Sequence, residues 1–263
     1  SNAMSMKKGN CKLHRMGEPH GPKVLLIHGA GFYWQTCFAR IIRDLKDRYC
    51  LLIPELEGHT AHPREYMVSV EETAGKLGEA LEELRVDKVQ AIYGVSLGAS
   101  VAVEMAIRGE IKVMNLLLDG GQYEGMGEMT EQYANIMADA FLNLLAGEHL
   151  PSPVKENMGF AANNDVEVLQ PLIYEHITRE ALLHALLAAY RYDLKAKNAR
   201  VDARVSVLIG GNEIYGAQFT PLLAEISRHP LDIYEFPNRG HAEVLSKEPE
   251  KISRLIREIL NYC

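Results

Sequence analysis

A serine at the centre of a glycine-flanked pentapeptide is the residue of this sequence with the clearest chemical potential. Gly94-Val95-Ser96-Leu97-Gly98 fits the pattern G-x-S-x-G, which can place a nucleophilic hydroxyl on a sharp strand-to-helix turn. The flanking glycines have no Cβ to clash with the neighbouring strand and helix. The helix N-terminus after the turn supplies free amides and a positive dipole end, which favour a developing oxyanion. The pentapeptide alone is a weak signal, so the elements on either side of it must show whether Ser96 is a nucleophile.

The context of Ser96 favours the nucleophile over a plain glycine-rich junction. The apolar run Lys88–Tyr93 directly precedes the pentapeptide and is typical of a buried strand. Residues 97–108 follow it with a helical pattern. A nucleophile elbow requires this order of strand, turn and helix, and the sequence therefore predicts one at Ser96.

The elements that must position this serine alternate along most of the chain. Short apolar strands followed by helices predict a parallel sheet that is covered on both faces. One helix opens with a capping box, Ser69-Val70-Glu71-Glu72. The predicted strands are Lys23–Ile27, Tyr49–Ile53 (ended by Pro54), Lys88–Tyr93, Lys112–Leu118, Arg204–Ile209 and Leu231–Phe236, and the predicted helices are 35–46, 69–85, 97–108, 220–228 and 249–261.

The alternation stops between residues 121 and 200, where no convincing strand is found. Two long helices are predicted there, at 130–146 and 178–197, with Thr130 and Thr178 as N-caps and a link from Pro151 to Pro171 between them. We interpret residues 121–200 as a helical cap inserted into a core made of residues 4–120 and 201–263. Ser1-Asn2-Ala3 matches a tag remnant and is excluded.

Composition limits the possible classes of protein. With 263 residues, 47% of them apolar, the chain is an ordinary globular protein, and its formal net charge of −7 disfavours nucleic-acid and membrane-surface binding. We find no apolar signal-peptide region and no uninterrupted apolar run of the roughly 18 residues that a membrane span needs. We therefore expect a cytoplasmic protein, and the oligomeric state stays open.

The cysteines are scattered, without a metal or redox spacing: Cys11, Cys37, Cys50 and Cys263.

Over residues 12–262 the sequence resembles the α/β-hydrolase family, whose motifs occur here in the family's order. They are His28-Gly29-Ala30-Gly31, Pro54-Glu55-Leu56-Glu57-Gly58-His59, the pentapeptide at 94–98, and Asn238-Arg239-Gly240-His241. The resemblance implies a mostly parallel, doubly wound sheet and a helical cap over the carboxyl ends of its strands. Because few residues precede Lys23, we expect the first edge strand of the fold to be missing.

The resemblance also implies an oxyanion hole formed by two backbone amides. One donor is Leu97, the residue after the serine, and by position the second is Ala30. Gly29 and Gly31 allow the backbone around Ala30 to approach closely. We expect His28 to shape this loop through hydrogen bonds.

A base and an orienting acid complete the implied site. His241 lies after the last strand, behind Gly240, where the family places its base. Gly210-Gly211-Asn212-Glu213 matches the family's G-x-x-D position, so Glu213 is our preferred acid. Asp119, at the end of the strand Lys112–Leu118, is the alternative.

These residues and the resemblance lead us to expect hydrolysis of a small-molecule carboxylic ester or thioester through an acyl-enzyme, with no cofactor and no metal. The cluster Glu55, Glu57, His59 and His62 matches no helix-borne metal motif, and we set it aside. Carbon–carbon bond hydrolysis, acyl transfer or peracid formation on the same residues, and a non-catalytic ligand-binding role, stay open as alternatives.

Overall fold

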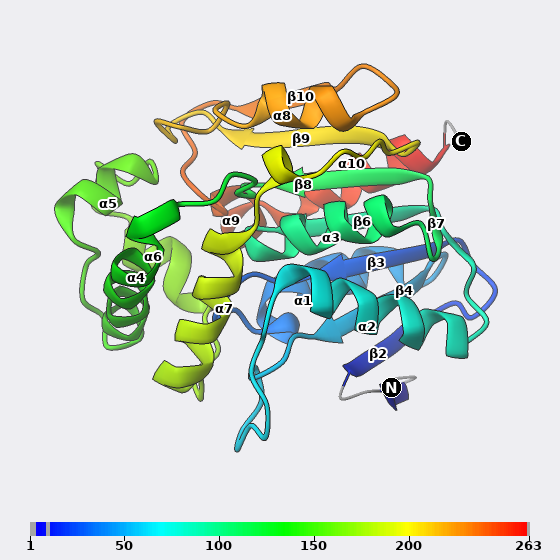
Figure 1. Ribbon diagram of the computed structural model, residues 1–263, viewed down its shortest axis with the longest axis horizontal. Coiled ribbons are helices and arrows are strands. Elements are labelled where there is room, and N and C mark those ends of the chain that lie inside the picture. The colour runs from blue at the N-terminus through cyan, green and yellow to red at the C-terminus, as the bar shows by residue number, and fades with distance from the viewer. Residues whose placement is uncertain (1–3, 9–10, 262–263) are drawn as a thin grey trace.

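The computed structural model describes residues 4–8 and 11–261, and its centre is one mostly parallel β-sheet (Figure 1). The suspected tag residues 1–3 lie outside the described residues. The sheet order is β1-β2-β4-β3-β6-β8-β9-β10; β2 runs antiparallel to β1 and β4, and all later neighbours are parallel. The strands are β1 (Met4–Lys8), β2 (Cys11–Gly17), β3 (Lys23–Ile27), β4 (Cys50–Glu55), β6 (Ala91–Val95), β8 (Asn115–Asp119), β9 (Arg204–Gly210) and β10 (Asp232–Phe236).

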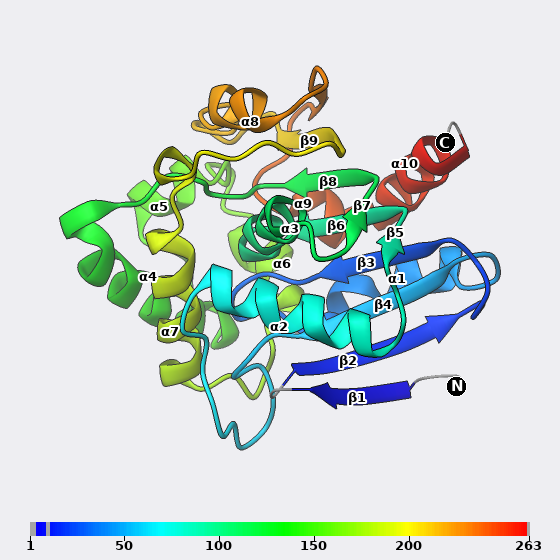
Figure 2. The ribbon, with the colours of Figure 1, turned by 45° about the vertical axis from the view of Figure 1, so that its right-hand side comes forward.

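Helices cover both faces of this sheet, which explains why its central strands are apolar runs. The side chains of Val24–Ile27 and Leu51–Ile53 are buried. α2 packs against α3 on one face, and α1 against α10 on the other (Figure 2). The helices of this part are α1 (Trp34–Leu45), α2 (Val70–Glu83), α3 (Leu97–Arg108), α8 (Thr220–Ile226), α9 (Glu243–Lys247) and α10 (Pro249–Asn261). The predicted α/β fold class is confirmed.

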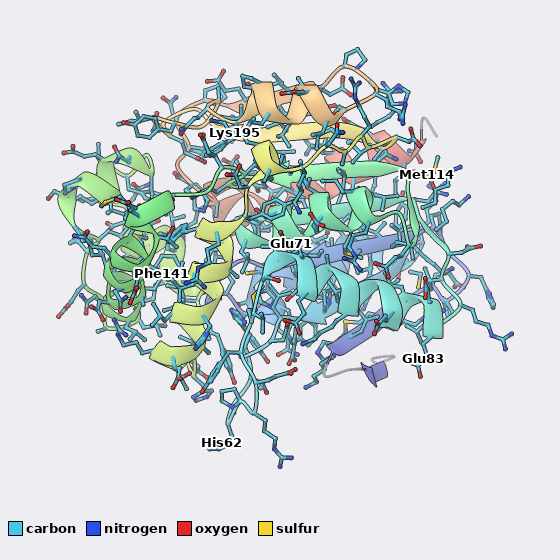
Figure 3. All side chains as sticks on the ribbon, in the orientation of Figure 1. His62, Glu71, Glu83, Met114, Phe141 and Lys195 are labelled. Atoms are coloured by element: carbon cyan, nitrogen blue, oxygen red, sulfur yellow. The ribbon has the colours of Figure 1, made fainter. Side chains whose placement is uncertain are left out.

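The segment between β8 and β9 contains helices and an isolated bridge between Ile173 and Phe32, but no strand in any of its described residues. These helices gather beside the carboxyl ends of the parallel strands, and Phe141 lies among them (Figure 3). Their division into a cap domain at 121–200 stays our prediction. They are η1 (Gly127–Met129), α4 (Thr130–Leu145), α5 (Ser152–Asn157), α6 (Asp165–Leu169), η2 (Gln170–Leu172), α7 (Arg179–Arg191) and η3 (Leu194–Ala196). Throughout the described ranges, no helix combines the length and apolar character that crossing a bilayer requires.

Two expectations about the edge of the sheet were wrong. The first edge strand is present, because β1 and β2 form a hairpin whose second strand pairs with β4. Strand β4 also continues through Pro54 to Glu55. Proline is tolerated there because β3 pairs with β4 only as far as Leu52, so the missing amide proton of Pro54 breaks no ladder bond on that side.

Two predicted strands are each interrupted by one residue. β5 (Lys88–Val89) and β7 (Lys112–Val113) pair with each other in a separate two-stranded sheet, and Gln90 and Met114 separate them from β6 and β8. The Gln90 amide donates to Lys23 O at 2.8 Å, and the Asn115 side chain donates to Gln90 O at 2.8 Å. The apolar pattern continues across both breaks, which is why it does not reveal them.

The predicted helix caps had different outcomes. The Ser69 hydroxyl accepts the Glu72 amide at 3.0 Å, and Thr178 accepts the Ala181 amide at 3.1 Å, so both N-caps are confirmed. Thr130 is not a cap, because η1 precedes α4 and the Thr130 hydroxyl donates to Gly127 O at 2.8 Å. The predicted link from Pro151 to Pro171 folds into the short helices α5 and α6.

Candidate active site

Ser96 lies on the sharp turn between β6 and α3, with φ 56° and ψ −121°. A non-glycine residue in this region of backbone space is strained, and such strain is concentrated at functional sites. The Ser96 amide donates to Asp119 O at 2.8 Å, which ties the turn to the end of the neighbouring strand. A Cβ on Gly94 would lie 2.3 Å from Gly98 O, and one on Gly98 would lie 2.2 Å from Ile27 O. Both glycines are therefore needed for this turn.

The backbone that carries Ala30 lies directly against Ser96. A Cβ on Gly29 would lie 3.1 Å from the Ser96 Cβ, and Gly31 has a φ of +75°. Ala30 and Leu97 both line the cavity into which Ser96 opens, and Leu97 is the first residue of α3. The two residues predicted to donate to an oxyanion thus line one cavity with the serine, Ala30 from the β3–α1 loop and Leu97 from the helix N-terminus.

Two buried histidines lock the Ala30 loop to the loop after β4. The Leu56 amide donates to His28 Nε2 at 3.1 Å, and the Gly31 amide donates to His59 Nε2 at 2.8 Å. Burial lowers the pKa of His28 well below its ordinary value and that of His59 to about 4, so both rings are neutral acceptors. The predicted hydrogen-bonding role of His28 is confirmed. His59 shares that role, which the sequence analysis did not predict for it.

Both glutamates of the cluster Glu55, Glu57, His59 and His62 also make hydrogen bonds. Glu55 accepts from Trp34 Nε1 at 2.9 Å and lies 2.8 Å from His14 Nε2, and Glu57 accepts from the Thr73 hydroxyl at 2.7 Å. No three His, Cys, Asp or Glu side chains of the described chain are grouped so that they could hold a metal ion.

His241 and Glu213 come together from two loops at the carboxyl end of the sheet. His241 Nδ1 lies 3.8 Å from Glu213 Oε2, and both side chains are largely buried. Their loops are joined by a bond from the Asn212 amide to Arg239 O at 2.9 Å. The Gly240 amide donates to Glu243 Oε1 at 2.8 Å, which fixes the backbone just before the histidine.

The end of α5 holds both loops in place. The Ile214 amide donates to Asn157 O at 3.1 Å, and the His241 amide donates to Met158 O at 2.8 Å. A Cβ on Gly159 would lie 2.8 Å from the Gly240 Cα, so the two backbones touch. The helical segment between β8 and β9 thus helps to build the site.

Asp119 is a second, deeper carboxylate beside the histidine. It is buried and accepts the Tyr93 hydroxyl at 2.5 Å. Burial, and then the charge of Glu213, raise its pKa to about 6 against the opposing effects of Tyr93 and His241. Burial lowers the pKa of His241, but Glu213 and then Asp119 outweigh it, so the pKa is raised above its ordinary 6.5.

One cavity of about 660 Å³ brings most of the predicted residues together. Ala30, Ser96, Leu97, Glu213 and His241 all line it, with walls from α4 and α7. The alternative acid, Asp119, is not part of the lining. The supporting glycines are not part of it either, but they allow the close backbone approaches around Ser96 and Ala30: Gly29, Gly31, Gly94 and Gly98.

Several residues that support this site carried little or no sequence signal. Gly120 has a φ of +71°, and a Cβ there would lie 2.7 Å from His241 Cε1. A glycine directly after a strand-terminal aspartate could have suggested such a close approach. Tyr93 and the carbonyl of Met158 act through contacts between distant segments, which no local pattern reveals.

Comparisons with known proteins place this geometry in a family. The model of the "Alpha/beta hydrolase family" matches residues 24–255. A pimeloyl-[acyl-carrier protein] methyl ester esterase from Chromobacterium violaceum is 26% identical over 251 residues, which cover 91% of this chain and 94% of the esterase. Two solved structures share the fold at 18% identity: a hydrolase from Pseudomonas aeruginosa (TM-score 0.74, 98% of both chains) and a thermophilic esterase from Thermogutta terrifontis (TM-score 0.72, 100% and 99%). The family match covers most of the sequence, and the chain therefore belongs to the alpha/beta hydrolase family.

Proposed function

We propose that this protein hydrolyses a small-molecule carboxylic ester or thioester through an acyl-enzyme on Ser96. The observation that carries the proposal is that Ser96 and His241 line the same cavity, with Glu213 Oε2 3.8 Å from the histidine Nδ1. The family match and the esterase relative support a hydrolase that acts on esters.

In the first half-reaction the Ser96 Oγ forms a bond to the substrate's carbonyl carbon. His241 takes the hydroxyl proton through Nε2, because Nδ1 faces Glu213, and returns that proton to the departing alcohol or thiol. Water then attacks the acyl-enzyme, and His241 repeats the transfer. The free acid leaves and Ser96 regains its proton.

The amides of Leu97 and Ala30 stabilise the negative charge on the carbonyl oxygen in both half-reactions. They belong to a helix N-terminus and to a loop held by buried histidines, so little reorganisation is needed when charge develops. The lining supports this role, since both residues face the same cavity as Ser96.

We assign the orienting acid to Glu213 and a tuning role to Asp119. Glu213 is the carboxylate in ion-pair range of Nδ1, and its charge favours the imidazolium that forms during proton transfer. Asp119 already accepts a hydrogen bond from the buried Tyr93 hydroxyl and acts on the ring through its charge. We further propose that residues 121–200 act as the cap that sets substrate choice and excludes water.

Labelling with a fluorophosphonate tests the proposal most directly, because this reagent modifies only an activated serine. We expect one label per chain, located on Ser96 by peptide mass spectrometry and lost in Ser96→Ala. Ser100 also lines the cavity, so Ser100→Ala is the matched control and should still be labelled. No labelling of the folded protein, or an unchanged label in Ser96→Ala, would refute the nucleophile.

A panel of p-nitrophenyl esters of increasing acyl length then measures turnover. Release of the free acid in water, rather than transfer of the acyl group to an added alcohol or to peroxide, distinguishes hydrolysis from the other reactions of the same residues.

A further inference from the structure

Few of the described residues that line the candidate active-site cavity carry a formal charge. Its acidic side chains are Glu124 and Glu213, and none of the described residues that line it is a lysine or an arginine. The formal net charge of the whole chain, −7, contributes a negative field at long range.

The charged groups around the cavity are already committed to one another. Glu213 faces His241, and Glu124 forms an ion pair with Lys195. The Lys195 side chain is 57% exposed and lies where the helical segment returns to the sheet (Figure 3). A carboxylate or phosphate on a substrate would therefore lose water on entering this cavity without gaining a cationic partner.

The rest of the wall suits uncharged groups. Met126, Met137, Phe141 and Phe219 provide apolar and adaptable surface. The Tyr123 hydroxyl is buried and has no hydrogen-bond partner within the described chain. Buried hydroxyls are normally paired, so we expect water or a bound molecule to supply its acceptor.

From this wall we infer that the cavity selects uncharged esters and excludes esters that carry an anionic group on the acyl chain. The inference rests on the proposed ester hydrolysis and names its class of substrate. The structural reason is an apolar wall whose two carboxylates already face cationic partners, with no lysine or arginine among its described lining residues to receive an anion.

Two esters of equal chain length and identical leaving group test the selection. Methyl 6-hydroxyhexanoate is neutral, whereas monomethyl adipate carries a carboxylate at the far end. We expect kcat/KM at pH 7 to be at least about tenfold higher for the neutral ester, because the carboxylate of monomethyl adipate loses hydration in the cavity without gaining a cationic partner. Equal values, or a preference for monomethyl adipate, would overturn the inference.

A charge introduced into the wall should change this ratio. Gln218→Lys places a cation in the lining and should lower the ratio of the two kcat/KM values toward one. Gln132 is exposed on α4 and lies outside the lining, so Gln132→Lys adds the same charge elsewhere. If both variants change the ratio equally, the overall charge selects the substrate and the wall does not.

Binding separates this inference from the proposed function. Calorimetric titration of Ser96→Ala with each ester requires no turnover, and the neutral ester should bind more tightly. If wild type turns over no ester while this preference persists, only the proposed hydrolysis fails. If turnover occurs without any preference in binding or kcat/KM, only the cavity's selection fails.

Discussion

His241 faces Glu213 and also feels the charge of a second, more deeply buried carboxylate, Asp119. Its Nδ1 is 3.8 Å from Glu213 Oε2, while the buried Asp119, held by Tyr93, acts on the ring through its charge. Each carboxylate favours the protonated imidazole, but only Glu213 lines the cavity. This arrangement allows the contributions of the two acids to be separated by substitution.

Glu213→Gln should lower kcat by about 10³-fold or more, because the imidazolium formed in the reaction loses its facing charge. Asp119→Asn keeps the hydrogen-bonding shape of the side chain and should cost about tenfold or less. Steady-state kinetics on one ester checks both variants. The opposite ranking would move the orienting role to Asp119.

Activity should fall as the pH drops through the pKa of His241. The base works only when neutral, and Glu213 and Asp119 raise its pKa above 6.5 despite burial, so the fall should begin above pH 6.5. Glu213→Gln removes one of the groups that raise it, and the midpoint of log(kcat/KM) against pH should move to lower pH. A midpoint that stays in place would show that Glu213 does not act on this histidine.

Gly120→Ala should impair catalysis more than stability. The alanine Cβ would lie 2.7 Å from His241 Cε1 and would push the ring away from its position. Gly109 has a similar φ of +67° with nothing within 4 Å of an added Cβ, so Gly109→Ala is a matched control. Both variants should lose about 1 to 2 kcal/mol in the free energy of unfolding from backbone strain.

Only Gly120→Ala should also lose activity, by about 10²-fold, as expected for a displaced catalytic group. Denaturant unfolding and kcat/KM, measured on both variants, make the comparison. Equal activity in the two variants would mean that the histidine ring tolerates the added methyl group.

The buried His59 should make the protein less stable in acid. Its pKa is about 4 in the folded chain and about 6.5 when unfolded, so the unfolded chain binds the extra proton between these values. The stability contribution is therefore complete above pH 6.5 and decreases as the pH falls toward 4, by about 3 kcal/mol in total.

His59→Gln should remove this pH dependence, whereas the exposed His176→Gln should not. Asp119, with a pKa raised to about 6, contributes the opposite slope between its unfolded value and pH 6. The measured quantity is therefore the difference in unfolding free energy between variant and wild type at each pH. A difference that does not vary with pH would contradict a neutral, buried His59.

The sequence alone was sufficient for the α/β class, the order of the main strands and the position of the sharp turn at Ser96. These follow from local patterns, since apolar runs, caps and glycine spacing are properties of neighbouring residues. Local pattern failed where pairing partners mattered: the β1–β2 hairpin, Pro54 within β4 and the breaks at Gln90 and Met114.

Only the tertiary structure decided how the site is held together. The choice of Glu213 as the nearer carboxylate, the depth of Asp119 and the loops held by Asn157 and Met158 depend on segments far apart in the chain. The physical reason is that distances, burial and the resulting pKa values arise from packing between elements. The sequence gives the residue types, but it does not give the distances between residues that are far apart in the chain.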